Sequence, residues 1–146
     1  MKDLDKNRII NKLQIIHNSL FKLKSLSNLS EDEFLSDFKY YDSTKYNFIQ
    51  CIEAIIDISN HIIARKKLGT PKTYSETFEI LGEKGILPKE YINTFKNMAK
   101  FRNKLVHFYA DVKDIEVYRI LRENLGDIEK FVEIVEDLIL KSENKN

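Results

Sequence analysis

The apolar residues of this sequence recur at the spacing of amphipathic helices. Near the N-terminus they follow one another at steps of four, three, four and three, which places them on one helix face. These residues are Ile9, Leu13, Ile16, Leu20 and Leu23. We therefore predict a first helix over residues 4–26. No part of the chain alternates apolar and polar residues as a half-buried strand does.

A second long helix is predicted over residues 43–67. Its broad apolar stripe consists of Ile49, Ile52, Ile55, Ile56, Ile62 and Ile63. Gly69 fits the end of this helix, because glycine adopts the backbone conformation that terminates helices. Before it, "SNLSEDEF" reads as a break, in which Ser30 and Glu33 have the spacing of a capping box for a short helix.

The second half of the chain predicts three more helices. "SETFEILGEKG" fits a short helix capped near Ser75 that ends at a glycine. Residues 86–109 predict the third long helix, with Pro88 in its first turn. The last helix is predicted to begin near Asp111, a good N-cap residue. Gly126 is expected to bend this helix without ending it.

Together these elements predict an all-α protein, an antiparallel four- to five-helix up-and-down bundle. The length of 146 residues suits one compact domain. We expect this domain to cover residues 1–141, with residues 142–146 as a flexible C-terminal tail. A composition of 42% hydrophobic and 32% charged residues is typical of a globular chain and excludes a disordered one.

The charge and the cysteine count narrow the functional classes. The net charge is +1, so any contact with nucleic acid must use a local basic patch. The single cysteine, Cys51, has no second thiol for an intrachain disulfide, which fits a reducing compartment. The N-terminal "MKDLDKNRII" lacks the apolar core of a signal peptide, and no apolar run has the length of a membrane span. We expect a cytoplasmic protein without a membrane partner.

A line of polar residues runs beside the apolar stripe of the second long helix. Because its members are three or four residues apart, they are expected to share one ridge. They are Gln50, Glu53, Asp57, His61 and Arg65. Asp57 and His61 have the spacing of half a metal site, but the ridge offers no third and fourth ligand, so we expect no metal.

The stretch "FRNKLVHFY", residues 101–109, places polar side chains where the third long helix should pack inward. The seam of that helix consists of Tyr91, Phe95, Met98, Arg102, Leu105 and Tyr109. An unpaired guanidinium in such a seam is costly to bury. Either the seam opens onto a cleft at Arg102 or a carboxylate meets it, and Glu53 and Asp57 are the candidate partners.

The side chains of Arg102 and His107 could act together on a phosphate, but they point in different directions from the predicted helix. They are roughly 140° apart around an ideal helix. They converge if the helix unwinds near His107, or if a second copy of the chain brings its own pair to the same cleft. A histidine moves protons near neutral pH, and an arginine stabilises phosphate charge. The pair suits metal-free cleavage of RNA by its own 2′-hydroxyl, and Tyr109 adds a ring for stacking or a hydroxyl for modification.

The alternative interpretation of this stretch is an ordinary helix end with an exposed histidine and a paired arginine.

A resemblance to a known family favours an active site in this stretch. "RNKLVHFY" resembles the R-x4-H-x-Y motif of the HepT-like toxins, a branch of the HEPN superfamily. "CIEAIIDISNHIIARKKLGTPKTYSETFEILGEKGILP" and "YADVKDIEVYRILRENLGDIEKF" are similar to the middle and the closing helix of that family. The resemblance covers about the whole chain, in the right order.

The resemblance implies a HEPN-like bundle that forms homodimers, with the motifs of two protomers meeting in an interfacial cleft. It implies a metal-independent endoribonuclease that needs no cofactor. Arg102 would stabilise the scissile phosphate and His107 would transfer protons, with Asn103 ordering the site. Asp57 and His61 would support it.

The resemblance also implies a toxin of a type II-like toxin–antitoxin pair. Its partner would be an MntA-like minimal nucleotidyltransferase, which transfers AMP to Tyr109 and so blocks the RNA phosphate site with bulk and negative charge.

A second function stays open. The chain is then a non-catalytic helical regulatory or binding subunit of a minimal nucleotidyltransferase. The near-neutral net charge favours this alternative. The cluster of basic residues on the third long helix favours the ribonuclease, because it supplies the local patch that RNA needs. The cluster consists of Lys96, Lys100, Arg102 and Lys104.

Overall fold

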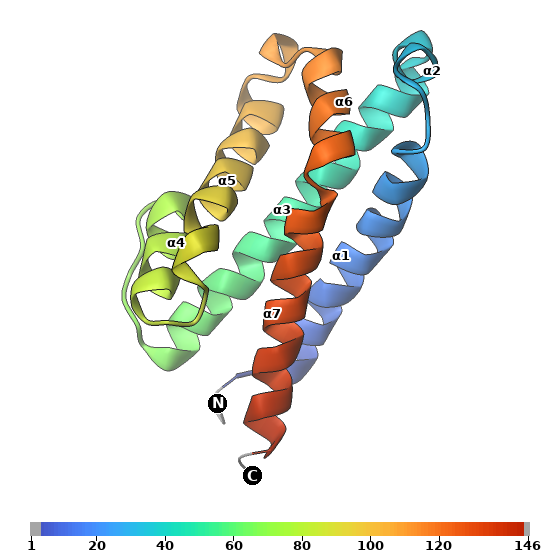
Figure 1. Ribbon diagram of the computed structural model, residues 1–146. Coiled ribbons are helices and arrows are strands. Elements are labelled where there is room, and N and C mark those ends of the chain that lie inside the picture. The colour runs from blue at the N-terminus through green and yellow to red at the C-terminus, as the bar shows by residue number, and fades with distance from the viewer. Residues whose placement is uncertain (1–3, 145–146) are drawn as a thin grey trace.

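The computed structural model describes residues 4–144, and this part of the chain is a bundle of helices without a β-strand (Figure 1). The α-helices are α1 (Lys6–Leu26), α2 (Glu31–Ser36), α3 (Phe38–Lys66), α4 (Tyr74–Glu83), α5 (Ile92–His107), α6 (Asp114–Glu123) and α7 (Leu125–Asn144). Two short 3-10 helices are η1 (Lys89–Tyr91) and η2 (Tyr109–Asp111). The predicted all-α class is confirmed.

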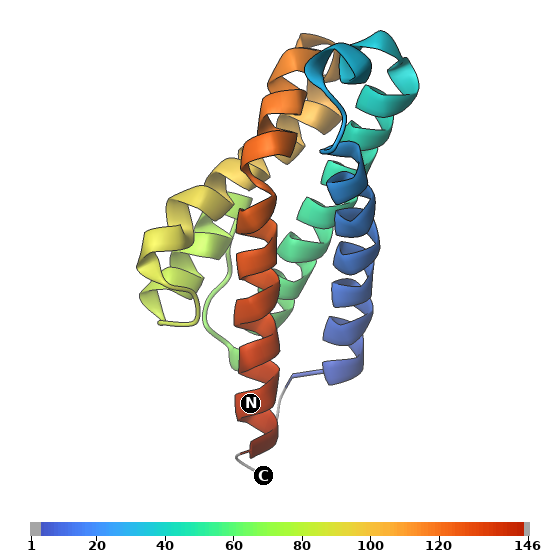
Figure 2. The same ribbon diagram turned by 45° about the vertical axis from the view of Figure 1, so that its right-hand side comes forward.

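The long helices alternate in direction, as an up-and-down bundle requires. In Figure 1, α1 and α5 run upward, while α3 and the α6–α7 pair run downward. Both ends of the chain therefore lie at the lower end of the bundle. Helix α3 packs most extensively against α1 and also contacts α2, α4, α5 and α6. Figure 2 shows α1 on one side of the bundle and the α4–α5 pair on the other.

Aromatic side chains join the helices at the centre of the bundle. Phe95 on α5 is fully buried, and its ring centroid lies 5.8 Å from that of Phe78 on α4 and 5.5 Å from that of Phe131 on α7. Phe48 and Phe101 join α3 to α5 in the same way, at 5.5 Å. The predicted face of the first helix is buried throughout. No helix within residues 4–144 has an apolar stretch long enough to cross a membrane.

Several predicted helix ends are confirmed and others are wrong. Ser30 and Glu33 form the predicted capping box of α2. Helix α3 begins earlier than predicted, because the carboxylate of Asp37 accepts a bond from the Lys39 N–H and starts the helix there. Thr73, rather than Ser75, caps α4.

The third long helix also starts later than predicted. Pro88 precedes the 3-10 turn η1, and regular α-helix begins only at Ile92.

The last predicted helix is divided into two. Asn124 leaves the helical conformation (φ −116°, ψ 3°), while its side chain donates to the Asp127 carboxylate at 3.2 Å. The break therefore lies at Asn124 and not at Gly126. Helix α6 begins after Lys113, so Asp111 is not its cap. Helix α7 continues to Asn144, three residues into the segment predicted as a tail, and residues 145–146 lie outside the described residues.

We predict that Phe95→Ala lowers the free energy of unfolding by about 3–5 kcal/mol, because it leaves a cavity in the core between the aromatic rings of Phe78 on α4 and Phe131 on α7. Phe21→Ala is the matched control, since Phe21 is 76% exposed and its loss should change stability by less than about 0.5 kcal/mol. Urea unfolding followed by circular dichroism measures both. Equal losses in the two variants would show that Phe95 does not hold the core.

Candidate active site

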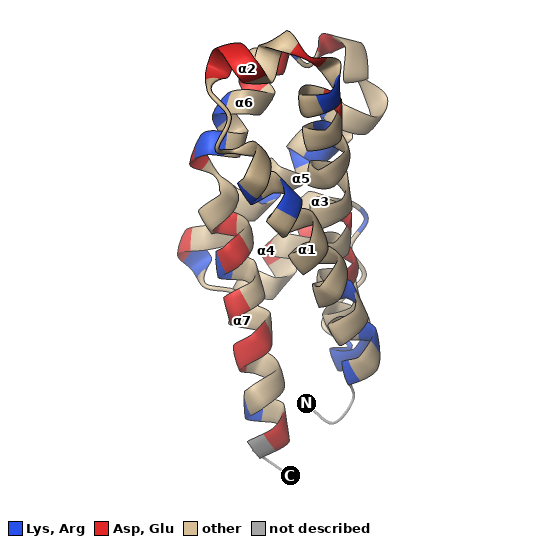
Figure 3. Ribbon diagram, turned by 90° about the vertical axis from the view of Figure 1, so that its right-hand side faces the viewer, with Lys and Arg blue, Asp and Glu red and all other residues tan. Residues whose placement is uncertain are grey.

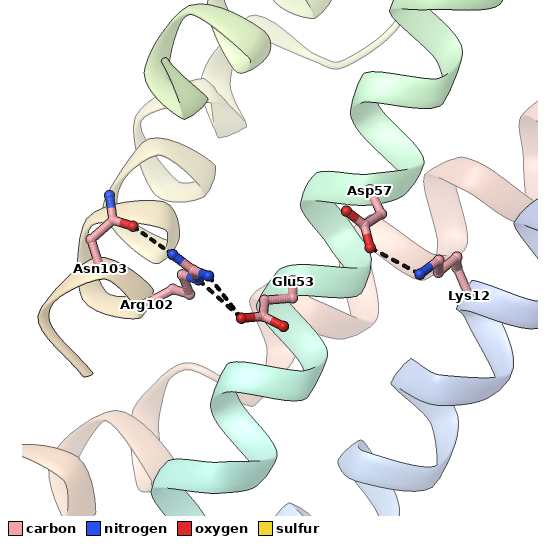
Figure 4. Close-up of polar contacts among 5 residues, drawn as sticks. All are labelled: Lys12, Glu53, Asp57, Arg102 and Asn103. Atoms are coloured by element: carbon pink, nitrogen blue, oxygen red, sulfur yellow. Dashed lines mark hydrogen bonds and ion pairs between the residues drawn. The ribbon is translucent and has the colours of Figure 1, made fainter. Parts of the chain in front are cut away.

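Arg102 lies in the seam between α5 and α3, where a carboxylate meets it. Its Nη2 and Nε donate to Oε1 of Glu53 at 2.8 and 3.3 Å (Figure 4). Its Nη1 donates to Oδ1 of Asn103 at 3.1 Å, and its guanidinium lies 5.7 Å from the centre of the Tyr74 ring. The side chain of Arg102 is 16% exposed, so it keeps a path to solvent. Of the two predicted partners, Glu53 is therefore the right one.

The contacts of Arg102 orient its guanidinium without using all its donors. A guanidinium has five N–H groups, and the contacts within residues 4–144 use three of them. One N–H remains on each terminal nitrogen, which is the pair that suits two oxygens of a phosphate. Asn103 supplies the contact on the side away from Glu53, and its role in ordering an active site stays a prediction.

A polar hollow of about 390 Å³ is lined by residues of α3, α4, α5 and the segment before α4. Its lining includes Tyr74 and Asn103, the two residues that also contact Arg102. The other lining residues are Asn60, Pro71, Lys72, Thr73 and Thr77. The side chain of Asn60 is oriented by the Thr77 hydroxyl, which donates to its Oδ1 at 2.9 Å. The hollow is lined by hydroxyl and amide groups, and Arg102 itself is not one of its lining residues.

His107 is the last residue of α5, and its side chain is exposed. The helix stays regular up to His107, because Phe108, which follows it, still donates its backbone N–H to the Lys104 carbonyl at 2.9 Å. Of the two predicted ways for Arg102 and His107 to converge, unwinding of this helix is therefore not realised. The other way, a second copy of the chain that brings its own pair to the same cleft, stays a prediction.

Tyr109 lies in the turn η2, directly after the helix. Its hydroxyl donates to Oδ1 of Asp42 on α3 at 2.7 Å. The ammonium of Lys45 lies 4.4 Å from the centre of the Tyr109 ring, and it is fixed there by Asp114 at 2.8 Å. Burial, the hydrogen bond to Asp42 and the negative charges of Asp42 and Asp114 together raise the pKa of Tyr109 to about 12.

Asp57 and His61 do not join this site. Asp57 forms an ion pair with Lys12 on α1 at 2.9 Å (Figure 4). His61 is buried, and its Nε2 accepts the backbone N–H of Asp5 at 3.1 Å, just before α1 begins. The structure does not bring either residue to Arg102, because each step of four residues turns about 40° around a helix, so the ridge drifts away from Glu53. Their supporting role stays a prediction.

The predicted basic cluster is largely neutralised. Lys96 pairs with Glu79 and Lys104 pairs with Glu116, in addition to the pair between Arg102 and Glu53. Figure 3 shows acidic residues along α7 and on α2, which makes those surfaces unsuited to RNA phosphates. Within residues 4–144 no three histidine, cysteine or acidic side chains come together as metal ligands.

No local pattern in the sequence points to Asp42, Lys45, Asp114 or Tyr74. Asp42 contacts a residue 67 positions away, and such a contact follows from how α3 and α5 pack. A buried lysine flanked by two tyrosine rings is likewise visible only in three dimensions.

Comparison with known proteins agrees with this architecture. Residues 16–135 match the family model described as Ribonuclease HepT-like. The chain is 29% identical over 127 residues to an mRNA nuclease HepT of Shewanella oneidensis, and the match covers 87% of this chain and 95% of that protein. It is also 29% identical over 146 residues to a tRNA nuclease HepT of Aphanizomenon flos-aquae, and that match covers 100% of this chain and 99% of that protein.

A solved structure is similar over nearly the same length. The tri-AMPylated Shewanella oneidensis HEPN toxin, in complex with an MNT antitoxin, matches with a TM-score of 0.82 at 28% identity. The match covers 89% of this chain and 97% of that one.

His61 makes stability depend on pH. Burial lowers its pKa from the ordinary value of 6.5, with the positive charges of Arg8 and Arg65 acting in the same direction. The unfolded chain therefore binds this proton at a higher pH than the folded chain does. We predict that the free energy of unfolding falls as the pH decreases from 7.5 through about 6.5.

Urea unfolding at a series of pH values measures this dependence. His61→Gln should reduce the slope, because the amide oxygen can accept the Asp5 N–H but does not titrate. The exposed His17 provides the control, and His17→Gln should keep the wild-type slope. A slope that survives His61→Gln would assign the effect to other groups.

Proposed function

Because this chain belongs to the HepT-like ribonuclease family, we propose that it is an endoribonuclease toxin of a toxin–antitoxin pair and acts in the cytoplasm. Its substrate is RNA. The observation that carries the proposal is the geometry of Arg102, which is oriented by Glu53 and Asn103 and keeps two N–H donors for a phosphate. The nuclease activity of two relatives that span most of this chain supports it.

The proposed reaction is attack of a 2′-hydroxyl on the adjacent phosphorus. A bond forms between the 2′-oxygen and phosphorus, the bond to the 5′-oxygen breaks, and the product ends in a 2′,3′-cyclic phosphate. Arg102 stabilises the charge that develops on the phosphate oxygens. His107 transfers a proton to or from the reacting oxygens. No metal is required by this scheme.

The site is completed by two protomers. Arg102 and His107 of one helix point in different directions, and α5 stays regular between them. A homodimer that brings two copies of α5 to one cleft supplies each phosphate with an arginine and a histidine. The exposed position of His107 at the end of α5 leaves it available to such a cleft.

The antitoxin partner is an MntA-like nucleotidyltransferase. In the proposed pair it transfers AMP to Tyr109, two residues beyond His107, and the added phosphate occupies the space that RNA needs. The AMPylated state of the Shewanella oneidensis HEPN toxin, in complex with its MNT antitoxin, supports this regulation.

The alternative is a regulatory subunit that does not cut RNA. The pairing of Lys96 and Lys104 with carboxylates favours it, because it weakens the basic patch. The two functions differ in whether the purified, unmodified chain cleaves RNA by itself.

We predict that the unmodified chain cleaves RNA in the presence of EDTA and leaves cyclic phosphate ends. Arg102→Ala and His107→Ala should each reduce the rate by about 100-fold or more, because each removes a group that acts on the phosphate. Gel electrophoresis of labelled RNA measures the rates, and size-exclusion chromatography checks the dimer.

The matched controls are Arg119→Ala and His17→Ala, which remove an exposed arginine on α6 and an exposed histidine on α1, both outside the motif. Both should cleave at the wild-type rate. Intact RNA with the wild-type chain would favour the regulatory subunit, and unchanged cleavage with His107→Ala would contradict the role of His107 in the reaction.

We further predict that co-expression with the cognate nucleotidyltransferase adds the mass of one or more adenylates to this chain. Tyr109→Phe should abolish the gain, since it removes the hydroxyl that accepts AMP. Intact-mass spectrometry measures it, and Tyr46→Phe is a control because Tyr46 is also an exposed tyrosine. An unchanged wild-type mass would contradict the regulation without affecting the ribonuclease.

A further inference from the structure

We propose that Asp42 accepts the proton of Tyr109 when that hydroxyl is adenylylated, so that the toxin carries the base for its own silencing. The inference rests on the proposed modification of Tyr109. It adds a catalytic residue, Asp42 on α3, which precedes Tyr109 by 67 positions in the chain.

The contact between Asp42 and Tyr109 has the geometry of a proton transfer. The hydroxyl donates directly to Oδ1 of Asp42 at 2.7 Å, which is the short distance typical of a hydroxyl bonded to a carboxylate. Tyr109 is 45% exposed, and Asp42 is also exposed. A nucleotide held by a partner enzyme can therefore approach the oxygen while the carboxylate stays in contact with it.

The surroundings of Tyr109 make a base necessary. With its pKa raised to about 12, the hydroxyl keeps its proton at neutral pH, and a neutral phenol is a weak nucleophile. A carboxylate that receives the proton during the attack removes this obstacle. A carboxylate serves hydroxyl nucleophiles in the same way during phosphoryl transfer by protein kinases.

The step balances with ATP as the co-reactant. The Oη atom of Tyr109 forms a bond to the α-phosphorus of ATP. The bond from that phosphorus to the oxygen bridging to the β-phosphate breaks, and pyrophosphate leaves with the electron pair. The proton of the hydroxyl passes to the carboxylate of Asp42. The product is a tyrosine joined to AMP through a phosphodiester.

Lys45 assists from the face of the ring. Its ammonium lies 4.4 Å from the ring centre and is held by Asp114, so it stabilises negative charge that grows on the ring as the proton leaves. The charged and titratable groups that face Tyr109 are Tyr41, Asp42 and Lys45 from α3 and Asp114 from α6.

The arrangement also distinguishes Tyr109 from another tyrosine of the bundle. The hydroxyl of Tyr118 donates to the backbone carbonyl of Leu29 at 2.8 Å. An amide carbonyl accepts a hydrogen bond but is too weak a base to take the proton. A carboxylate on the hydroxyl therefore gives Tyr109 a reactivity that Tyr118 lacks.

The test measures the initial rate of mass gain when this chain is mixed with its cognate nucleotidyltransferase, Mg²⁺ and ATP. Asp42→Asn should slow the gain about 100-fold at pH 7, within the usual contribution of general base catalysis. Asp42→Glu should recover most of the rate, since it restores a carboxylate. Asp111→Asn is the matched control in the same turn, and it should react at the wild-type rate.

The pH profile separates a base from a structural contact. Without a base only the phenolate attacks, so the rate of Asp42→Asn should rise about tenfold per pH unit between 7 and 9, while the wild-type profile is flatter. Circular dichroism checks that the variants are folded. A rate for Asp42→Asn within about threefold of wild type, with the same profile, overturns the role of Asp42. A wild-type chain that gains no adenylate, or a Tyr109→Phe chain that gains it equally, overturns the modification itself.

Discussion

The continuity of α3 is the constraint on which the rest of this structure depends. The helix runs without interruption from Phe38 to Lys66, and one side chain after another along it fixes a different part of the bundle. Asp42 holds the turn that contains Tyr109, Glu53 holds Arg102, and His61 holds the start of α1. From Asp42 to Glu53 is about 16 Å along the helix axis, at 1.5 Å per residue. These separations are as rigid as the helix itself.

Two cationic side chains, one partly buried and one buried, join α5 and α6 to α3. Arg102 brings α5 to Glu53, and Lys45 brings α6 to α3 through Asp114. An unpaired charge in either place would cost several kcal/mol, so each pair fixes the position of the helices that carry it. His107 lies between the two anchored residues Arg102 and Tyr109. Its backbone is therefore positioned from both sides, although its own side chain reaches into solvent.

The sequence predicted those features that depend on neighbours along the chain. The arginine in the seam of α5 and the capping box of α2 follow from helical spacing. The spacing also predicted a carboxylate partner for Arg102, but it left Glu53 and Asp57 both open. The break at Asn124 did not, because Asn124 and Gly126 both weaken a helix and only packing decides between them. Asp57 and His61 do not reach Arg102, because a ridge with steps of four drifts around its helix. The contact between Asp42 and Tyr109 depends on two helices meeting, which periodicity in one helix does not reveal.

The pair between Arg102 and Glu53 also sets how easily this protein can lose its proposed activity. Arg102 is 16% exposed and Glu53 is 40% exposed. An apolar residue in place of the arginine would complete the seam of α5 and leave the carboxylate in water. Removing one partner of a buried ion pair is destabilising because the other charge is left buried, but Glu53 is exposed enough for water to solvate its carboxylate, so the loss of stability should be small. Loss of Arg102 would therefore separate the proposed activity from the fold: the chain would lose its phosphate-binding group and keep its bundle.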